Sequence, residues 1–320
     1  MTQAATVSTE DREIIIKRSF HATIPQLWRA WSDPALIGKW FGPDGFTTDT
    51  SRMEFREGGV WEFLMTGPDG RVWPNFVRYE VIEENARIVY SQAGAPDEVA
   101  FRTEVRFERL AEGQCSMTLR MMFKSAEDRD RVIREVGAIE GGIGTVSRLG
   151  RLCADSGPAP VCVALPSDRE IIIARDFDAS RELVWRAMTE PALLERWMFL
   201  PPGWRMSECA EDVRPGGRFQ WAWVDSAGAP VMAMGGEYRE VAHPERIVRT
   251  ERFEFGCQPQ AGEQLVTMTL EERPAGRTAL RLLIEFPSRE ARDGMLASGM
   301  DEGMSAGYGK LDGLLASAGV

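Results

Sequence analysis

Residues Arg12–Leu36 read REIIIKRSFHATIPQLWRAWSDPAL, and residues Arg169–Leu193, 157 positions later, read REIIIARDFDASRELVWRAMTEPAL. Of the 25 aligned positions, 14 are identical, which is far more than chance gives. The repeat distance is close to half of the 320-residue chain. A period of this length indicates that a whole domain has been duplicated, because solenoid repeats are much shorter.

The duplication continues beyond this opening stretch. Trp40 aligns with Trp197, and the Gly-Gly pair at 58–59 aligns with the pair at 216–217. We therefore expect one domain over residues 1–153 and a second over residues 168–320. Residues 154–167 contain Pro and small side chains, which are typical of an inter-domain linker.

Each copy has the same order of predicted elements. A β-branched strand, such as residues 13–20, precedes two short helices, and Pro34 and Pro191 begin the second of these. Strands with polar and apolar residues in alternation follow, as in residues 60–65 and 218–224, and this alternation indicates an antiparallel sheet with one exposed face. A long helix with apolar residues at helical spacing closes each copy. The fold class is therefore α+β, with two tandem domains.

The composition excludes several classes of function. The net charge of −11 disfavours partners with a phosphate backbone, so we expect no nucleic-acid partner. No long apolar run is present, so we expect no membrane insertion. The N-terminal residues lack the pattern of a secretion signal. The five cysteines have no CxxC spacing and are typical of reduced thiols, so we expect a cytoplasmic protein.

The sequence contains no recognisable catalytic or metal motif. Its two histidines, His21 and His243, lack the spacing of metal ligands. No nucleophile elbow, phosphate-binding loop or dinucleotide fingerprint is present. We therefore predict no catalytic residue, no metal and no cofactor, and lean towards a protein that is not an enzyme.

The repeated motif resembles a known superfamily. The pattern A-x5-W-x-A-x-(S/T)-(D/E)-P, followed by Trp40 or Trp197 and by Gly-Gly, is similar to the SRPBCC (START-like, helix-grip) superfamily. Within it, the chain resembles proteins related to the C-terminal domain of the activator of the heat-shock-protein ATPase. The resemblance implies a curved antiparallel sheet wrapped around the C-terminal helix, with a cavity between them. Positions that carry the motif are Ala22, Trp28, Ala30, Pro34, Trp40, Ala179, Trp185, Ala187, Pro191 and Trp197.

Aromatic and apolar residues on the predicted inner faces indicate a small-molecule site with few polar groups, or alternatively a filled core. If it is a site, its ligand is a small hydrophobic or aromatic molecule. The two copies differ at aligned positions, so we expect two different pockets or one degenerate copy. The candidate ligand-binding residues are Trp31, Trp61, Phe63, Trp73, Asn75, Ile139, Ile143, Met188, Phe219, Trp221, Met232, Met234, Met300 and Met304.

Glycines recur on one face of each closing helix, at 137, 141 and 144 and at 299, 303 and 307. Glycine destabilises a helix interior by about 0.5–1 kcal/mol relative to alanine, so a steric reason is expected. Either the sheet approaches the helix closely, or the helix leaves volume for a ligand.

Two other functions remain open. An enzyme of the polyketide cyclase or dehydratase type would use pocket carboxylates, for which Glu140 and Glu302 are the candidates. A chaperone-interaction module would expose an apolar patch, and the chain could also form a homo-oligomer. Burial of the two glutamates at the cavity would favour the enzyme, and exposure of both would remove it.

Overall fold

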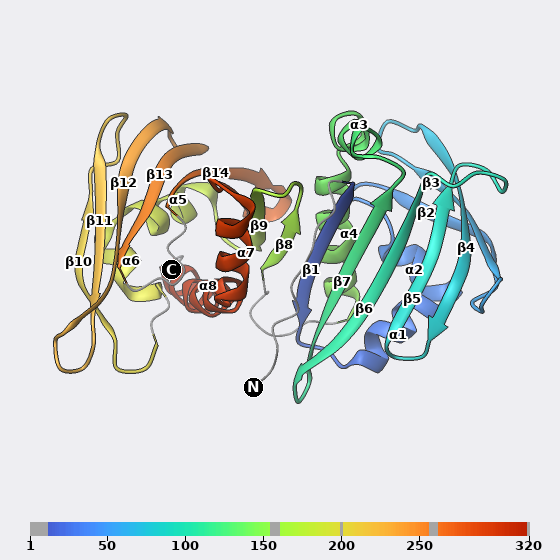
Figure 1. Ribbon diagram of the computed structural model, residues 1–320, viewed down its shortest axis with the longest axis horizontal. Helices are drawn as coiled ribbons and strands as arrows, with labels where there is room; N and C mark the ends of the chain where they lie inside the picture. The colour runs from blue at the N-terminus through green and yellow to red at the C-terminus, as the bar shows by residue number, and fades with distance from the viewer. Residues whose placement is uncertain (1–11, 154–160, 199–200, 256–261, 319–320) are drawn as a thin grey trace. The chain divides into compact units, whose positions relative to one another are not determined.

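The computed structural model describes residues 12–153, 161–198, 201–255 and 262–318. These residues form two compact units, one made of residues 12–153 with 162–167 and the other made of residue 161 with residues 168–198, 201–255 and 262–318. Each unit is an antiparallel sheet with helices on its concave face, as the sequence pattern predicts (Figure 1).

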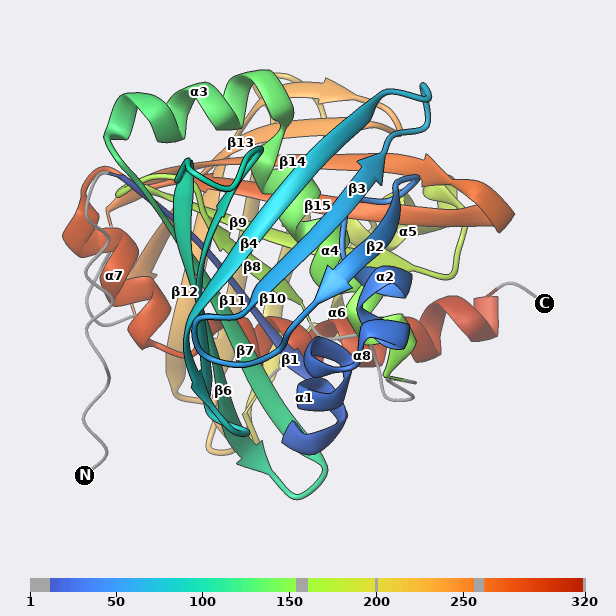
Figure 2. The same ribbon diagram turned by 90° about the vertical axis from the view of Figure 1, so that its right-hand side faces the viewer.

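The first unit has eight strands in the order β2-β3-β4-β5-β6-β7-β1-β8, and every neighbouring pair is antiparallel. Figure 2, which faces this unit, shows α2 lying against β2. Its elements are β1 (Glu13–Phe20), α1 (Ile24–Ser32), α2 (Pro34–Trp40), β2 (Thr47–Met53), β3 (Val60–Thr66), β4 (Val72–Glu83), β5 (Arg87–Ala93), β6 (Phe101–Ala111), β7 (Gln114–Phe123), α3 (Ala126–Val136), α4 (Ala138–Leu152) and β8 (Cys162–Leu165).

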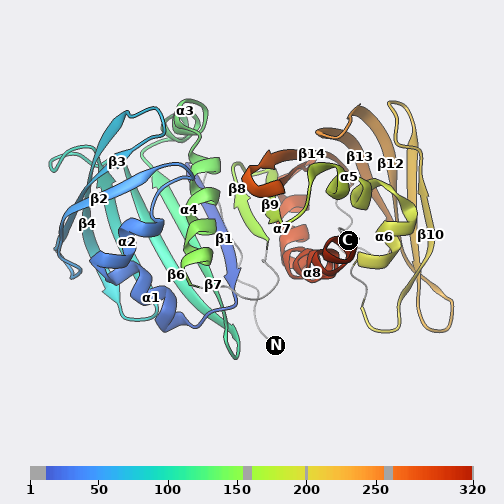
Figure 3. The same ribbon diagram turned by 180° about the vertical axis from the view of Figure 1, so that it is seen from behind.

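The second unit has seven strands in the order β10-β11-β12-β13-β14-β15-β9, again all antiparallel. Figure 3 shows its helices α5, α6 and α8 together on the inner side of the sheet. Its elements are β9 (Glu170–Phe177), α5 (Arg181–Thr189), α6 (Pro191–Trp197), β10 (Arg205–Glu211), β11 (Arg218–Val224), β12 (Pro230–Ala242), β13 (Arg246–Phe255), β14 (Glu263–Arg273), the 3-10 turn η1 (Pro274–Gly276), β15 (Arg277–Glu285), α7 (Arg289–Ala297) and α8 (Met300–Ala318).

The repeated tryptophans hold the two short helices together. The indole Nε1 of Trp40 donates to the carbonyl of Ala30 at 2.9 Å, and Nε1 of Trp197 donates to the carbonyl of Ala187 at 2.8 Å. Both indoles are buried, so each polar N–H needs such a partner. Because the same bond occurs in both units, these two tryptophans of the motif have a structural role.

The closing helix of each unit is not continuous, contrary to the sequence-based expectation. Gly137 separates α3 from α4 with φ 61° and ψ 46°, and Gly299, between α7 and α8, has φ 77°. This left-handed conformation favours glycine because a Cβ atom would be strained there. The first glycine of each stripe is therefore a break between two helices and not a helix-interior residue.

The predicted linker also differs from the structure. Residues 154–160 lie outside the described residues, but Cys162–Leu165 form β8, which pairs with β1 through residues 15–18. All four residues of β8 are buried. The sequence analysis assigned this short apolar strand to the linker because the surrounding stretch is rich in Pro and small residues.

Candidate ligand cavity in the second unit

A cavity of about 330 Å³ lies in the second unit, between the inner face of the sheet and helix α8. Pockets of this size are typical of small-molecule sites. The wall contains aliphatic and aromatic side chains from α5, α6 and strands β11 to β15. Seven of its lining residues are methionines, namely Met188, Met198, Met234, Met268, Met295, Met300 and Met304.

The glycines of α8 take part in this cavity. Gly303 and Gly307 both line it, beside Met304 and Tyr308. In the first unit, by contrast, a Cβ atom on Gly141 would lie 3.2 Å from Pro43. The same glycine pattern therefore leaves volume in one unit and permits close packing in the other.

Aromatic rings occupy the corresponding core of the first unit. Trp31 replaces Met188 and Phe41 replaces Met198, by alignment of the repeated motif. The Trp31 indole lies 4.8 Å from the ring of Trp40, and Phe41 lies 4.8 Å from Trp61. Trp61 stacks on Phe63 at 4.1 Å, and Trp31 donates from Nε1 to Sδ of Met117 at 3.3 Å. These rings fill space that methionines line in the second unit.

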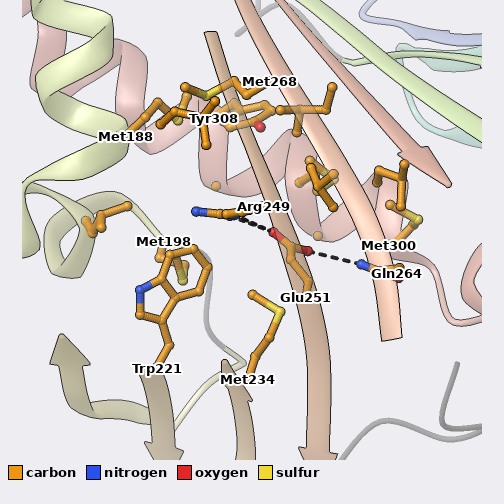
Figure 4. Close-up of a pocket in the computed structure, with 18 of the residues that line it drawn as sticks. Met188, Met198, Trp221, Met234, Arg249, Glu251, Gln264, Met268, Met300 and Tyr308 are labelled. Carbon is orange, nitrogen blue, oxygen red and sulfur yellow. Dashed lines mark hydrogen bonds and ion pairs between the residues drawn. The ribbon is translucent and has the colours of Figure 1, made fainter. Parts of the chain in front are cut away.

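A polar cluster forms part of the cavity wall. The guanidinium of Arg249 donates to one oxygen of Glu251 through Nε at 2.9 Å and Nη2 at 2.6 Å. The other oxygen of Glu251 accepts from Nε2 of Gln264 at 3.0 Å. All three residues line the cavity, and Figure 4 shows them connected in a row among the methionines. A buried, hydrogen-bonded charge pair of this kind is held in one geometry.

The same cluster extends to three residues that do not line the cavity, namely Phe219, Glu211 and Tyr238. Arg249 stacks on the ring of Phe219 at 4.5 Å and on Trp221 at 5.0 Å. Glu211 accepts from the hydroxyl of Tyr238 and, at 2.9 Å, from Nε1 of Trp221. Burial raises the pKa of Glu211, against the opposing effects of Arg249 and these hydrogen bonds.

The pKa of Arg249 is also raised. Burial alone would lower it, but the neighbouring carboxylate of Glu251, with Tyr238 and Glu211 beyond, outweighs that effect. The guanidinium therefore stays charged inside an apolar wall. A fixed cation, a fixed carboxylate and an amide give this cavity the few convergent polar groups that ligand sites usually have.

The candidate residues from the sequence fall into three groups. Met188, Trp221, Met234, Met300 and Met304 line the cavity. Phe219 lies beneath Arg249 and is buried, and Met232 is half-buried on β12 beside Trp223; neither lines the cavity. In the first unit, Trp31, Trp61, Phe63 and Ile139 are buried in the core, whereas Trp73, Asn75 and Ile143 are half-buried.

The two glutamates proposed as pocket carboxylates are exposed. Glu140 lies in the first turn of α4 and Glu302 in the first turn of α8, and neither is buried at a cavity. The enzyme hypothesis as framed on these residues is wrong. The carboxylate in the cavity wall is Glu251, from a strand.

Sequence reasoning missed Arg249, Glu251, Gln264 and Tyr308. A signal was present in β13, where Ile247, Arg249, Glu251 and Phe253 alternate with outward-facing residues and so share the inner face. Charged residues on an apolar face of a half-buried strand are unusual and mark a functional or paired site.

Neither a metal centre nor a membrane-spanning helix occurs in the described part of the chain. No group of three or more His, Cys, Asp or Glu side chains there could hold a metal ion. No helix among those residues has both the length and the apolar character needed to cross a membrane.

The antiparallel sheet and the order of helices define each unit as a helix-grip domain of the SRPBCC superfamily. The chain belongs to the family described as "Activator of Hsp90 ATPase homolog 1-like protein", which it matches twice, over residues 21–152 and 178–316. The tandem organisation predicted from the repeat is thus a pair of domains of one family.

Solved structures resemble single units of the chain. A crystal structure of a protein from Rhodobacter sphaeroides is 32% identical, covers 47% of this chain and 95% of its own, and has a TM-score of 0.43. A protein from Nitrosomonas europaea is 22% identical, with 45% and 96% covered and a TM-score of 0.42. An HSP90 activator from Plasmodium falciparum is 21% identical, with 37% and 72% covered and a TM-score of 0.27. The comparison with curated proteins gave no match.

Proposed function

We propose that the second unit binds a small hydrophobic or aromatic molecule in the cavity between its sheet and α8. The observation that carries this proposal is the cavity of about 330 Å³, lined by methionines and aromatic rings with one polar cluster. Thioether side chains are flexible and polarizable, and they contact aromatic rings favourably. Such a lining suits a flat apolar ligand.

The first unit, in this proposal, is a packed copy that does not carry the ligand. Trp31 and Trp61 are each 1% exposed, and their rings join a continuous aromatic cluster. A duplicated domain keeps its fold when aromatic side chains fill its core, because close packing replaces the contacts that a ligand would make.

Two alternatives have less support. The cyclase or dehydratase hypothesis loses the two carboxylates on which it was based, because Glu140 and Glu302 are exposed. A chaperone partner is suggested by the family, whose description names an activator of a chaperone ATPase. Five large apolar side chains are exposed among the described residues, namely Leu64, Val72, Val99, Leu110 and Val136, and all five belong to the first unit. Leu64 and Val72 lie on the neighbouring strands β3 and β4, whereas Val99 precedes β6, Leu110 lies in β6 and Val136 ends α3.

The proposal is tested with a neutral dye, N-phenyl-1-naphthylamine, whose fluorescence rises in apolar sites. We expect saturable binding with one site per chain, and competition by small aromatic molecules. Native mass spectrometry of the protein from its own host would identify a retained molecule. Absence of saturable dye binding to the folded chain would refute the proposal, and capture of a purified chaperone instead would favour the alternative.

A further inference from the structure

The polar cluster of the second unit is absent from the equivalent positions of the first. The strand registers place Tyr90 where Arg249 stands and Gln92 where Glu251 stands. Met53 and Glu211 are equivalent positions in the two units, because Met53 pairs with Trp61 and Glu211 pairs with Phe219. The first unit therefore has a methionine where the second has a glutamate. By the same comparison, Phe101 replaces Gln264.

The first unit therefore acts as an internal control for the second. It has the same fold with methionine, tyrosine, glutamine and phenylalanine at these positions, so the fold does not require the charges. Burial of a guanidinium and carboxylates has a large desolvation cost, which an apolar or neutral set of side chains avoids. A charged cluster that is dispensable for folding and faces a cavity is best explained by what the cavity holds.

The hydrogen bonds of Glu251 leave room for one more donor. Its carboxylate accepts two hydrogen bonds from Arg249 and one from Gln264 among the described residues. A carboxylate can accept about four. Since Glu251 lines the cavity, its remaining lone pair is a position where a ligand O–H or N–H would be bound.

The charge of the cluster disfavours an anionic ligand. It contains one guanidinium, on Arg249, and two carboxylates, on Glu211 and Glu251, linked through hydrogen bonds and electrostatic contacts. Glu251 already neutralises the only cation among the described lining residues, so a ligand carboxylate would be desolvated without a free positive partner. A neutral ligand avoids this cost.

We propose that the cavity selects a neutral aromatic molecule whose hydroxyl group donates a hydrogen bond to Glu251. A cavity of about 330 Å³ falls within the usual range of small-molecule sites. This inference rests on the proposed function, because it names the ligand class of the same cavity.

The test compares three ligands of one shape by displacement of N-phenyl-1-naphthylamine from the full chain. 2-Naphthol carries the donor, 2-methoxynaphthalene lacks it, and 2-naphthoate carries a negative charge. We expect 2-naphthol to bind about tenfold or more tightly than 2-methoxynaphthalene, since hydrogen bonds to charged groups are strong, and 2-naphthoate to bind weakest. Equal binding of the naphthol and its methyl ether, or tightest binding of the naphthoate, would overturn the inference and leave the proposed function standing. Failure of the dye itself to bind would overturn both.

A double variant assigns the selectivity to the cluster. Arg249→Tyr with Glu251→Gln reproduces the combination that the first unit already accommodates at Tyr90 and Gln92. We expect the dye still to bind and the preference for 2-naphthol over the ether to fall to about twofold or less. Glu254→Gln on the outer face of the same strand is the matched control and should retain the full preference. A preference that survives in the double variant rejects Glu251 as its source.

Discussion

The hydroxyl of Tyr238 donates to the carboxylate of Glu211, whereas the buried hydroxyl of its counterpart Tyr79 has no hydrogen-bond partner among the described residues. The difference follows from one position, where Met53 in the first unit stands in place of Glu211. A buried carboxylate introduced into one copy of the fold has a raised pKa, mainly because of burial. The free energy of unfolding should therefore depend on pH through the protonation of Glu211.

We predict that Glu211→Gln removes a contribution to stability that grows as the pH falls. A folded-state pKa above the ordinary value of 4.5 means that the folded protein binds a proton more readily than the unfolded chain. The contribution of Glu211 is therefore fully present below the unfolded pKa and is lost as the pH rises through the folded pKa. Urea unfolding between pH 7.5 and 4.5 should show the wild type gaining stability relative to the variant as the pH is lowered.

Glu254→Gln, on the exposed outer face, is the control for this measurement, since it removes a carboxylate outside the cluster. Its difference from the wild type should not follow the same trend. If the difference between wild type and Glu211→Gln stayed constant over the pH range, or changed in the opposite direction, the assignment of the raised pKa to this residue would be wrong.

We predict that Met188→Trp combined with Met198→Phe abolishes ligand binding by filling the cavity. These substitutions copy Trp31 and Phe41, which pack against Trp40 and each other in the first unit. Larger side chains in a packed core cost about 1–3 kcal/mol, but here they enter existing space, so the change in unfolding free energy should be smaller. Dye titration should show no saturable binding. Retention of binding by the folded double variant would place the ligand elsewhere.

The fold was predictable from the sequence because its determinants are local and occur twice. The repeated motif and the alternation in β3 and β11 are read directly from the chain. Local capping supports the same elements, because Ser125 and Ser180 accept from backbone N–H groups in the first turns of α3 and α5. Strands β2 and β10 were missed because they are polar, as in TTDTSRM, and carry little of the apolar alternation that marks a strand.

The site was only partly predictable because it depends on side chains that meet across strands. Met234 and Trp221 could be placed on an inner face by period-two alternation, and both line the cavity. Glu251 and Gln264 are 13 residues apart, and their bond depends on the register of β13 against β14. Whether the glycines of a closing helix leave space or allow close packing depends on which loop approaches that helix, as Pro43 approaches Gly141. The spacing of glycines along the sequence does not reveal this.

We predict that Trp31→Ala destabilises the first unit by about 3–5 kcal/mol, the usual cost of removing a large buried aromatic side chain. The substitution should also open a cavity among Trp40, Phe41 and Tyr90, whose rings contact Trp31. Added indole should recover part of the lost stability, as measured by urea unfolding. Trp73→Ala, at a half-buried position, should cost less and should show no recovery with indole.

We predict opposite effects for two glycine-to-alanine changes in the closing helices. In α8, a Cβ atom on Gly313 would meet no atom within 4 Å, so Gly313→Ala should stabilise the protein by about 0.5–1 kcal/mol through helix propensity alone. In α4, a Cβ atom on Gly142 would lie 2.2 Å from Cδ1 of Ile16, which is fully buried in β1. Gly142→Ala gains the same propensity but forces Ile16 to move, at a cost of about 1–3 kcal/mol, so the net effect should be destabilising. Thermal unfolding of the two variants measures the difference directly. A stabilised Gly142→Ala variant would contradict this prediction. It would mean that α4 moves easily away from β1, so that close packing of this helix is not what fills the core of the first unit.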